Sequence, residues 1–180
     1  MYRGTFENCS SLSSVTFEEG FKVTSLRGTF INCTSLTEIT IPATVEELTF
    51  ESADHHGDPS YGTFGGCTNL EMVTFEEGSQ LKVLQGAFAY CSKLETITIP
   101  ETFEVFDEVT SGYSTFRGCS NLKTIYLLSP NPPSAPNYYF TDYFIGTPDD
   151  LIIYVPQGSL TAYQTAGGWS DMADHIQEMP

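Results

Sequence analysis

Cysteine is the residue type with the widest chemistry in this chain, and five cysteines occur along its 180 residues. They are Cys9, Cys33, Cys67, Cys91 and Cys119. Their odd number and equivalent settings argue against a disulfide framework. The pattern supplies no local second ligand of the Cys-x-x-Cys kind, which disfavours zinc, and no basic, exposed setting that would activate a thiol. We therefore expect small, buried packing residues.

The segment "ESADHHGD", residues 51–58, gathers imidazoles and carboxylates in one insert. His55, His56 and Asp58 are weak candidates for binding zinc or a similar ion. Adjacent histidines point apart in an extended chain, so a metal site needs a special loop shape, whereas a solvated surface insert needs none. Both interpretations stay open, and we assign no metal and no cofactor to the chain.

Two copies of "FEEG" bring paired carboxylates, Glu18 with Glu19 and Glu76 with Glu77. Two repeat units separate the pairs, roughly 10 Å in a stack of strands. That is too far to share one calcium ion, and we interpret them as polar turns. No Gly-x-Ser-x-Gly, His-Glu-x-x-His or phosphate-binding loop occurs. The sequence predicts that the protein is not an enzyme.

Composition narrows the class of partner. Seven basic residues face 23 acidic ones, and the net charge of −16 excludes nucleic acid and disfavours anionic membrane surfaces. The longest apolar runs are far shorter than the ~20 residues of a membrane span, so direct insertion is not expected. Met1 stands inside a repeat with no signal peptide, and we expect a fragment of a longer protein.

The cysteines belong to a repeated frame, Phe-x-x-Cys-x-x-Leu, whose regular recurrence is typical of a solenoid. Its five copies run from Phe6 to Leu12, Phe30 to Leu36, Phe64 to Leu70, Phe88 to Leu94 and Phe116 to Leu122. A longer rhythm of 58 residues repeats "VTFEEG" at 15 and 73, and "ITIP" at 39 and 97. Two kinds of coil therefore alternate.

Two apolar residues separated by one follow each frame, as in Ile39 and Ile41, and they point the same way in a strand. The pattern predicts one short parallel strand per coil, at 14–17, 38–41, 72–75, 96–99 and 124–127. A second inward set should line the opposite wall: Val23 and Leu26, Val45 and Leu48, Leu81 and Leu84, and Phe103 and Phe106. Stacked neighbours then bury a core that one coil cannot bury alone.

The combined pattern, Leu-x-x-Ile-x-Ile-Pro-x-x-Val-x-x-Leu followed by Gly-Thr/Ala-Phe-x-x-Cys-x-x-Leu, resembles the BspA-like, treponemal-type leucine-rich repeat. The resemblance covers residues 4 to about 128 and implies a right-handed coil with one short parallel strand per repeat. It also implies a bacterial cell-surface or secreted protein with adhesin-like roles. The "FEEG" coils and the inserts at 49–62 and 107–114 depart from the family pattern.

We divide the chain into five coils over residues 1–128, the first truncated, and a capping segment over 129–180. The latter begins with a Pro-rich loop at 129–137 and an aromatic segment at 137–144. "LIIYVP" at 151–156 predicts one more strand that closes the stack. Two short helices should follow, with Ser159 and Ser170 as their N-caps and Gly167 between them.

The outward residues of the predicted strands are the first candidates for binding, because solenoids bind through such extended faces. They are Thr16, Glu38, Thr40, Met72, Thr74, Thr96, Thr98, Thr124 and Tyr126. The alternative is plain solubility, since threonine suits an exposed pleated surface. A second candidate patch for sugar rings or a protein anchor is Tyr138, Tyr139 and Tyr143.

The leading hypothesis is a non-enzymatic, monomeric attachment module at the cell surface or outside the cell, with a protein or glycan partner. The alternatives are a structural spacer or end-cap of a larger surface protein, and a carbohydrate-binding module.

Overall fold

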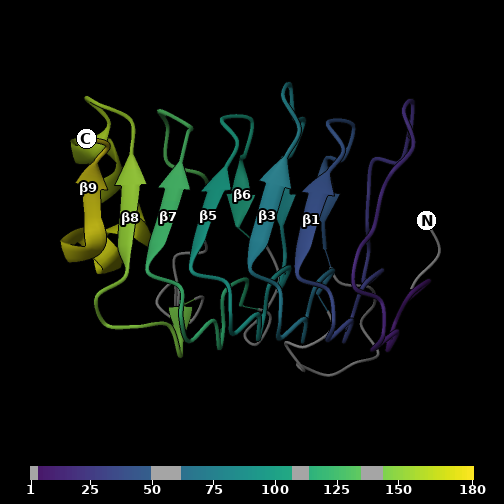
Figure 1. Ribbon diagram of the computed structural model, residues 1–180. Helices are drawn as coiled ribbons and strands as arrows, with labels where there is room; N and C mark the ends of the chain where they lie inside the picture. The colour runs from purple at the N-terminus through teal and green to yellow at the C-terminus, as the bar shows by residue number, and fades with distance from the viewer. Residues whose placement is uncertain (1–3, 50–61, 107–113, 135–143) are drawn as a thin grey trace.

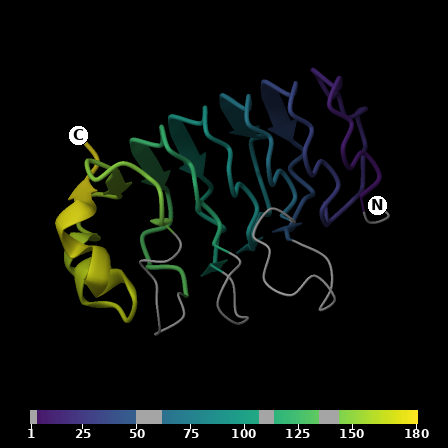
Figure 2. The ribbon, with the colours of Figure 1, turned by 90° about the horizontal axis from the view of Figure 1, so that it is seen from below.

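The coils of the chain stack along one axis, as a computed structural model that describes residues 4–49, 62–106, 114–134 and 144–180 shows (Figure 1). Six short strands lie side by side along one face, which we call the front face, and the helical part sits at one end of the stack (Figure 2). The strands are, in spatial order, β1 (Glu38–Ile41), β3 (Met72–Phe75), β5 (Thr96–Ile99), β7 (Thr124–Leu127), β8 (Ile152–Val155) and β9 (Ile176–Glu178). Their pairings are parallel, which confirms the repeat solenoid.

A second sheet forms the back wall. It consists of β2 (Glu47–Leu48), β4 (Val83–Leu84) and β6 (Val105–Phe106), paired in parallel in that order. Isolated bridges extend this wall to Ser25 on one side and Ser134 on the other. The second inward set therefore lines the opposite wall as predicted, with Leu48 and Leu84 fully buried.

Alternation of side chains explains why these segments are strands. In β1 and β5 the burial alternates strictly, so that Ile39, Ile41, Ile97 and Ile99 face the core while their neighbours face solvent. The β-branched and aromatic residues of these segments suit a pleated surface with one buried face. The inward residues of both walls belong to a single hydrophobic cluster that runs the length of the stack.

The phenylalanines of the repeat frame form a continuous ring stack at the corner between the walls. Successive centroids lie 5.5 to 6.0 Å apart. The members are Phe6, Phe30, Phe64, Phe88, Phe116 and Phe144. Phe144 thus extends the ring stack beyond the five coils of the sequence frame, while the division of the chain at residue 128 stays a prediction.

The residue two places after each stacked phenylalanine has a left-handed backbone, with φ between 56° and 83°. These residues are Asn8, Asn32, Gly66, Tyr90, Gly118 and Gly146. Glycine and asparagine adopt this conformation most readily, and Tyr90 carries its strain. Gly146 shares the conformation, so the turn after Phe144 has the same geometry as the five corners before it.

The cysteines form a second ladder beside the rings. Each thiol from Cys33 onward donates to the carbonyl of the phenylalanine one coil earlier, as Cys67 does to Phe30 at 3.1 Å. Cys33, Cys67, Cys91 and Cys119 are buried, as expected, whereas Cys9 is exposed. Cys9 belongs to the first described coil, where no thiol–carbonyl bond of this kind is found.

The front face is not one continuous sheet. β1 pairs with β3, and β5 pairs with β7, but β3 and β5 lie side by side without a ladder although both are fully described. The N–H of Glu76 extends the first ladder by donating to Ile41, and the N–H of Leu128 extends the second by donating to Ile99, each at 3.0 Å. The equivalent residue between β3 and β5 is Pro100, which has no N–H. We call this break the seam.

Residues 14–17 correct the prediction of one strand per coil, because they adopt no strand. The residue that would extend a ladder from β1 to this segment is Pro42, which again lacks the donor. Both interruptions thus precede an "ITIP" strand, and the 58-residue rhythm of the sequence is also the rhythm of the breaks. Val15 and Phe17 still pack against the core as partly buried side chains.

The C-terminal part matches the prediction in outline and corrects it in two details. β8 pairs with β7 as predicted, but β9 then pairs with β8 and is the last strand of the row. The helix α1 (Leu160–Thr165) has Ser159 at its N-cap position as predicted, and the Ser159 side chain makes no cap hydrogen bond. The second helix is a 3-10 helix, η3 (Trp169–His175), and its N-cap is Gly168 rather than Ser170. With φ at 79°, Gly168 takes a backbone that serine adopts only with strain.

Candidate binding face

Strand register arranges the outward side chains of the front face in two rows. In the first row Thr40 lies opposite Thr74, and Thr98 lies opposite Tyr126, which in turn lies opposite Tyr154. The second row pairs Glu38 with Met72, and Thr96 with Thr124 and then Ile152. Outward residues of adjacent strands on one face are direct neighbours, so each row is a physical surface.

Exposure differs along the rows. The outward residues of β1, β3 and β5 are exposed, and Met72 reaches 57%. Those of β7 and β8 are half-buried because larger side chains cover one another: the rings of Tyr126 and Tyr154 stack at 5.1 Å between centroids, with 15° between their planes. The first row therefore changes from polar and open to aromatic toward the C-terminal end, while the second row ends at the aliphatic Ile152.

Sequence reasoning placed eight of its nine candidates on these strands, and the ninth, Thr16, is exposed but lies outside any strand. It missed Ile152 and Tyr154, although "LIIYVP" was recognised as a strand. The register signal was available, because Ile153 and Val155 repeat the inward spacing of the earlier strands and leave Ile152 and Tyr154 outward.

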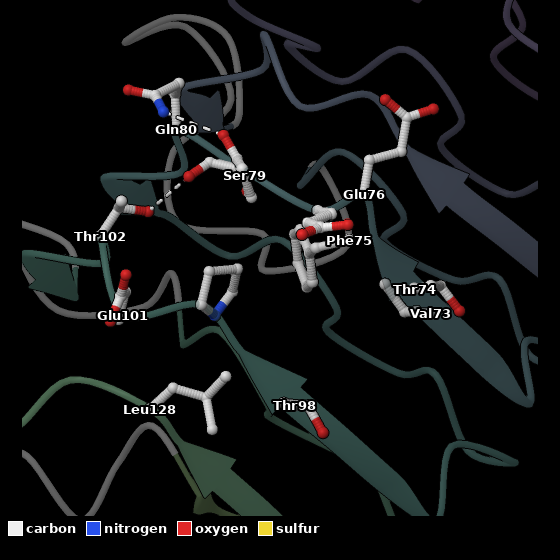
Figure 3. A pocket seen from close by; sticks show the side chains of 13 residues that line it. Val73, Thr74, Phe75, Glu76, Ser79, Gln80, Thr98, Glu101, Thr102 and Leu128 are labelled. Carbon is white, nitrogen blue, oxygen red and sulfur yellow. Dashed lines mark hydrogen bonds between the residues drawn. The ribbon is translucent and has the colours of Figure 1, made fainter.

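Two hollows open along the seam. The distal hollow, at the C-terminal ends of the strands, has a volume of about 550 Å³, and the proximal hollow, at their N-terminal ends, about 720 Å³. Val73 and Thr98 line both, so the hollows adjoin along the seam, and we call the two together the groove. The distal hollow is lined by Val73, Thr74, Phe75, Glu76, Glu77, Gly78, Ser79, Gln80, Thr98, Pro100, Glu101, Thr102 and Leu128 (Figure 3).

The distal hollow combines an apolar floor with an acidic rim. Phe75 and Pro100 are half-buried, while Leu128 is 41% exposed. Its carboxylates, Glu76, Glu77 and Glu101, are exposed, and none of the described residues that line the hollow is basic. The Oε2 atom of Glu76 accepts a hydrogen bond from the Ala43 N–H at 2.9 Å, which ties this carboxylate to the neighbouring coil. The local field favours a cation.

The proximal hollow has a mixed rim. The Lys93 ammonium lies 3.4 Å from a Glu71 oxygen across the seam, and both side chains are more than half exposed. Such a pair contributes little stability, because solvent screens it. The lysine nevertheless offsets part of the negative charge at this end, so the cation-favouring field belongs to the distal hollow.

The distal hollow is open because the second copy of "VTFEEG" lacks an aromatic side chain that follows the first copy. Ser79 stands 58 residues after Phe21, in the second copy of "VTFEEG". In the first copy the ring of Phe21 packs on Phe17 at 4.8 Å between centroids. In the second copy Phe75 keeps the position of Phe17, but its aromatic partner is replaced by the small Ser79.

The thiols offer no reactive site at the buried positions. Burial raises the pKa of Cys33 to about 11, and that of Cys67 and Cys119 to about 12. A thiol that stays protonated at neutral pH is neither a nucleophile nor a ready metal ligand. This agrees with a packing role.

Two other candidate groups lie outside the described residues: His55, His56 and Asp58 in the insert, and Tyr138, Tyr139 and Tyr143 in the aromatic segment. Within the part of the chain that is described, no cluster of three His, Cys, Asp or Glu side chains is arranged to hold a metal ion. In that same part, no helix has the length and apolar character needed to cross a membrane.

Comparison with known proteins identifies one family. The model of the BspA type leucine rich repeat region matches residues 1–54 and 60–145, in six copies. Among solved structures, the chain is similar to the T. pallidum leucine rich repeat protein, at 17% identity and a TM-score of 0.40, over 87% of this chain and 78% of that one. It is also similar to a leucine-rich repeat protein of Bacteroides ovatus, at 18% identity and a TM-score of 0.33, over 78% of this chain and 51% of that one. No match is found among curated protein sequences.

Proposed function

The chain belongs to the BspA-type leucine-rich repeat family, and from that premise we propose that it is a non-enzymatic attachment module which binds a partner protein through its front face. Repeats of this family are typically non-enzymatic and mediate protein interactions. We place the module at a bacterial cell surface or outside the cell, where family members typically act.

The observation that carries the proposal is the pair of in-register rows on β1, β3, β5, β7 and β8. These rows present methyl groups, hydroxyl groups and two tyrosine rings on one extended surface. Tyrosine and methionine are typical anchors of protein interfaces, whereas a surface kept only for solubility needs neither Met72 nor the Tyr126–Tyr154 pair.

The experiment compares two triple-lysine variants that change the net charge equally. One carries Thr40→Lys, Thr124→Lys and Tyr154→Lys on the front face. The control carries Thr24→Lys, Thr68→Lys and Ser120→Lys, three exposed positions away from the front strands. Both are tested for attachment to a panel of immobilised extracellular matrix proteins and to a glycan array, after thermal melting shows that both fold.

We expect the front-face variant to lose attachment to matrix protein by at least about tenfold, because buried lysines at an interface are costly, while the control keeps it. Equal attachment by both variants would refute a front-face binding role and favour the spacer or end-cap function. A signal confined to the glycan array would replace the protein partner with a carbohydrate.

A further inference from the structure

The seam allows the partner's chemistry to be specified. Resting on the proposed function, we propose that the distal hollow receives a lysine or arginine side chain carried by an extended basic segment of the partner protein. To bind such a side chain, the hollow needs an apolar floor for its methylene groups, the stem, and an acidic rim for its positively charged group, the head.

The floor suits the stem. Long basic side chains pack their methylene groups on apolar surface while the charged head stays near solvent. Phe75, Pro100 and the exposed Leu128 offer such a surface between β3, β5 and β7. The hollow's volume of about 550 Å³ exceeds that of one side chain, so it accommodates the head with its hydration water.

The rim suits the head. Glu77 and Glu101 line the hollow beside this floor, while the Glu76 carboxylate accepts the Ala43 N–H of the neighbouring coil. Among the described residues, no basic side chain lines the hollow to neutralise these carboxylates. The chain as a whole carries 23 acidic against seven basic residues, so its long-range field also attracts a basic segment. The proximal hollow, where Lys93 already faces Glu71, does not share this preference.

The first copy of the repeat supports the assignment. Phe21 and Lys22 occupy the positions that Ser79 and Gln80 take in the second copy. The first copy therefore carries an aromatic ring, which packs on Phe17, and a lysine in the same segment as Glu18 and Glu19. The second copy keeps the carboxylates and lacks both of the other groups, so a partner supplies them.

The groove also suits an extended segment. It follows the seam past Val73 and Thr98, where two strands lie side by side without a ladder. A chain laid along it directs every second side chain toward the sheet, so one basic residue enters the distal hollow while another residue covers the proximal one.

The test uses the full chain and three fluorescein-labelled nonapeptides that alternate threonine and valine and differ only at the centre. The central residue is arginine, norleucine or glutamate. Fluorescence anisotropy measures affinity, and two-dimensional amide NMR locates the site. We expect saturable binding of the arginine peptide, with shifts at Phe75, Thr98 and Glu101, affinity for the norleucine peptide at least about fivefold lower, and no binding of the glutamate peptide.

Two variants make the test specific. Ser79→Phe restores the aromatic partner of the first copy, fills the hollow and should weaken arginine-peptide binding at least about tenfold. Glu77→Gln with Glu101→Gln should weaken it about fivefold and reduce its salt dependence. The matched control, Glu18→Gln with Glu19→Gln, removes the same charge from the first copy and should leave binding unchanged.

The absence of saturable arginine-peptide binding up to millimolar concentration would overturn the inference, as would equal binding of the glutamate peptide. If Ser79→Phe fails to fold, comparison of Glu77→Gln with Glu101→Gln against the matched control still tests the inference. The inference is wrong while the proposed function stands if the front-face lysine variant loses matrix attachment but Glu77→Gln with Glu101→Gln leaves that attachment unaffected. The proposed function fails if the lysine variant keeps full attachment, since its three positions lie outside the distal hollow.

Discussion

Replacing Phe88 by alanine tests whether the ring stack holds the solenoid together. Phe88 is fully buried and stacks on Phe64 at 5.6 Å and on Phe116 at 6.0 Å. Truncating a buried phenylalanine costs about 3–5 kcal/mol, because burial and packing are lost and a cavity remains. The matched variant is Phe6→Ala, where a half-buried ring in the first described coil stacks on Phe30, and we expect a loss of about 1 kcal/mol there.

The assay is urea unfolding followed by two probes. Fluorescence of the chain's single tryptophan, Trp169, reports on the C-terminal cap, where it is buried, while far-ultraviolet circular dichroism reports on the coils. Coincident transitions justify a single free energy of unfolding. In thermal melting the Phe88→Ala loss corresponds to about 6–20 °C for a chain of this size. Equal losses for Phe88→Ala and Phe6→Ala would refute the reasoning, because position in the stack would then not matter.

Three further predictions concern the thiols and the seam. In the native protein a thiol reagent should modify exposed Cys9 rapidly and the four buried cysteines only on unfolding; rapid modification of two or more would contradict their burial. Burial raises the pKa of the Cys67 thiol to about 12, so the stability that this thiol contributes is fully present below pH 9 and decreases as the pH rises toward 12. Cys67→Ala should therefore make the melting temperature less dependent on pH between 9 and 12. An unchanged pH dependence would count against this prediction. Pro100→Ala supplies the missing donor opposite Phe75, and amide exchange measured by NMR should show protection at residue 100; free exchange there would mean that the proline is not the cause of the seam.

The repeat frame made the architecture predictable because each of its residues has a packing reason that recurs in every coil. The spacing of Phe30, Cys33 and Leu36 fixes a corner, and the alternation of Ile39 and Ile41 fixes a strand after it. These are local patterns that one sequence displays repeatedly, so the core and both walls followed from them.

The features that sequence reasoning missed depend on neighbours rather than on local pattern. β9 is a strand only because β8 offers an edge to Ile176, and Trp169 is buried by contacts with residues far away in the chain, as its N–H bond to the Pro133 carbonyl at 2.8 Å shows. The seam did have a local signal, since Pro100 lacks a donor. Its effect, however, was apparent only when the proline was placed opposite Phe75.

Of the candidate face, the outward positions could be deduced from alternation, whereas the hollow could not. It arises from a difference between two copies, Ser79 in place of Phe21, and such a difference reveals an opening only when the fold shows that the two positions share one environment. The charge around it was visible in the sequence as "FEEG", but the apolar floor that joins Pro100 and Leu128 to it was not.

The seam also sets the mechanical behaviour of the stack. At the level of the seam, the back wall is tied by the N–H groups of Glu104 and Val105, which both donate to the Lys82 carbonyl at 3.0 Å. The corner is tied by the Phe64 N–H, which donates to Ala87 at 2.8 Å. Bending that opens the front separates side chains but breaks no ladder, whereas bending that opens the back must rupture backbone hydrogen bonds. The solenoid is therefore stiffer in one direction than in the other, and a load applied across it is relieved first at the front, between β3 and β5.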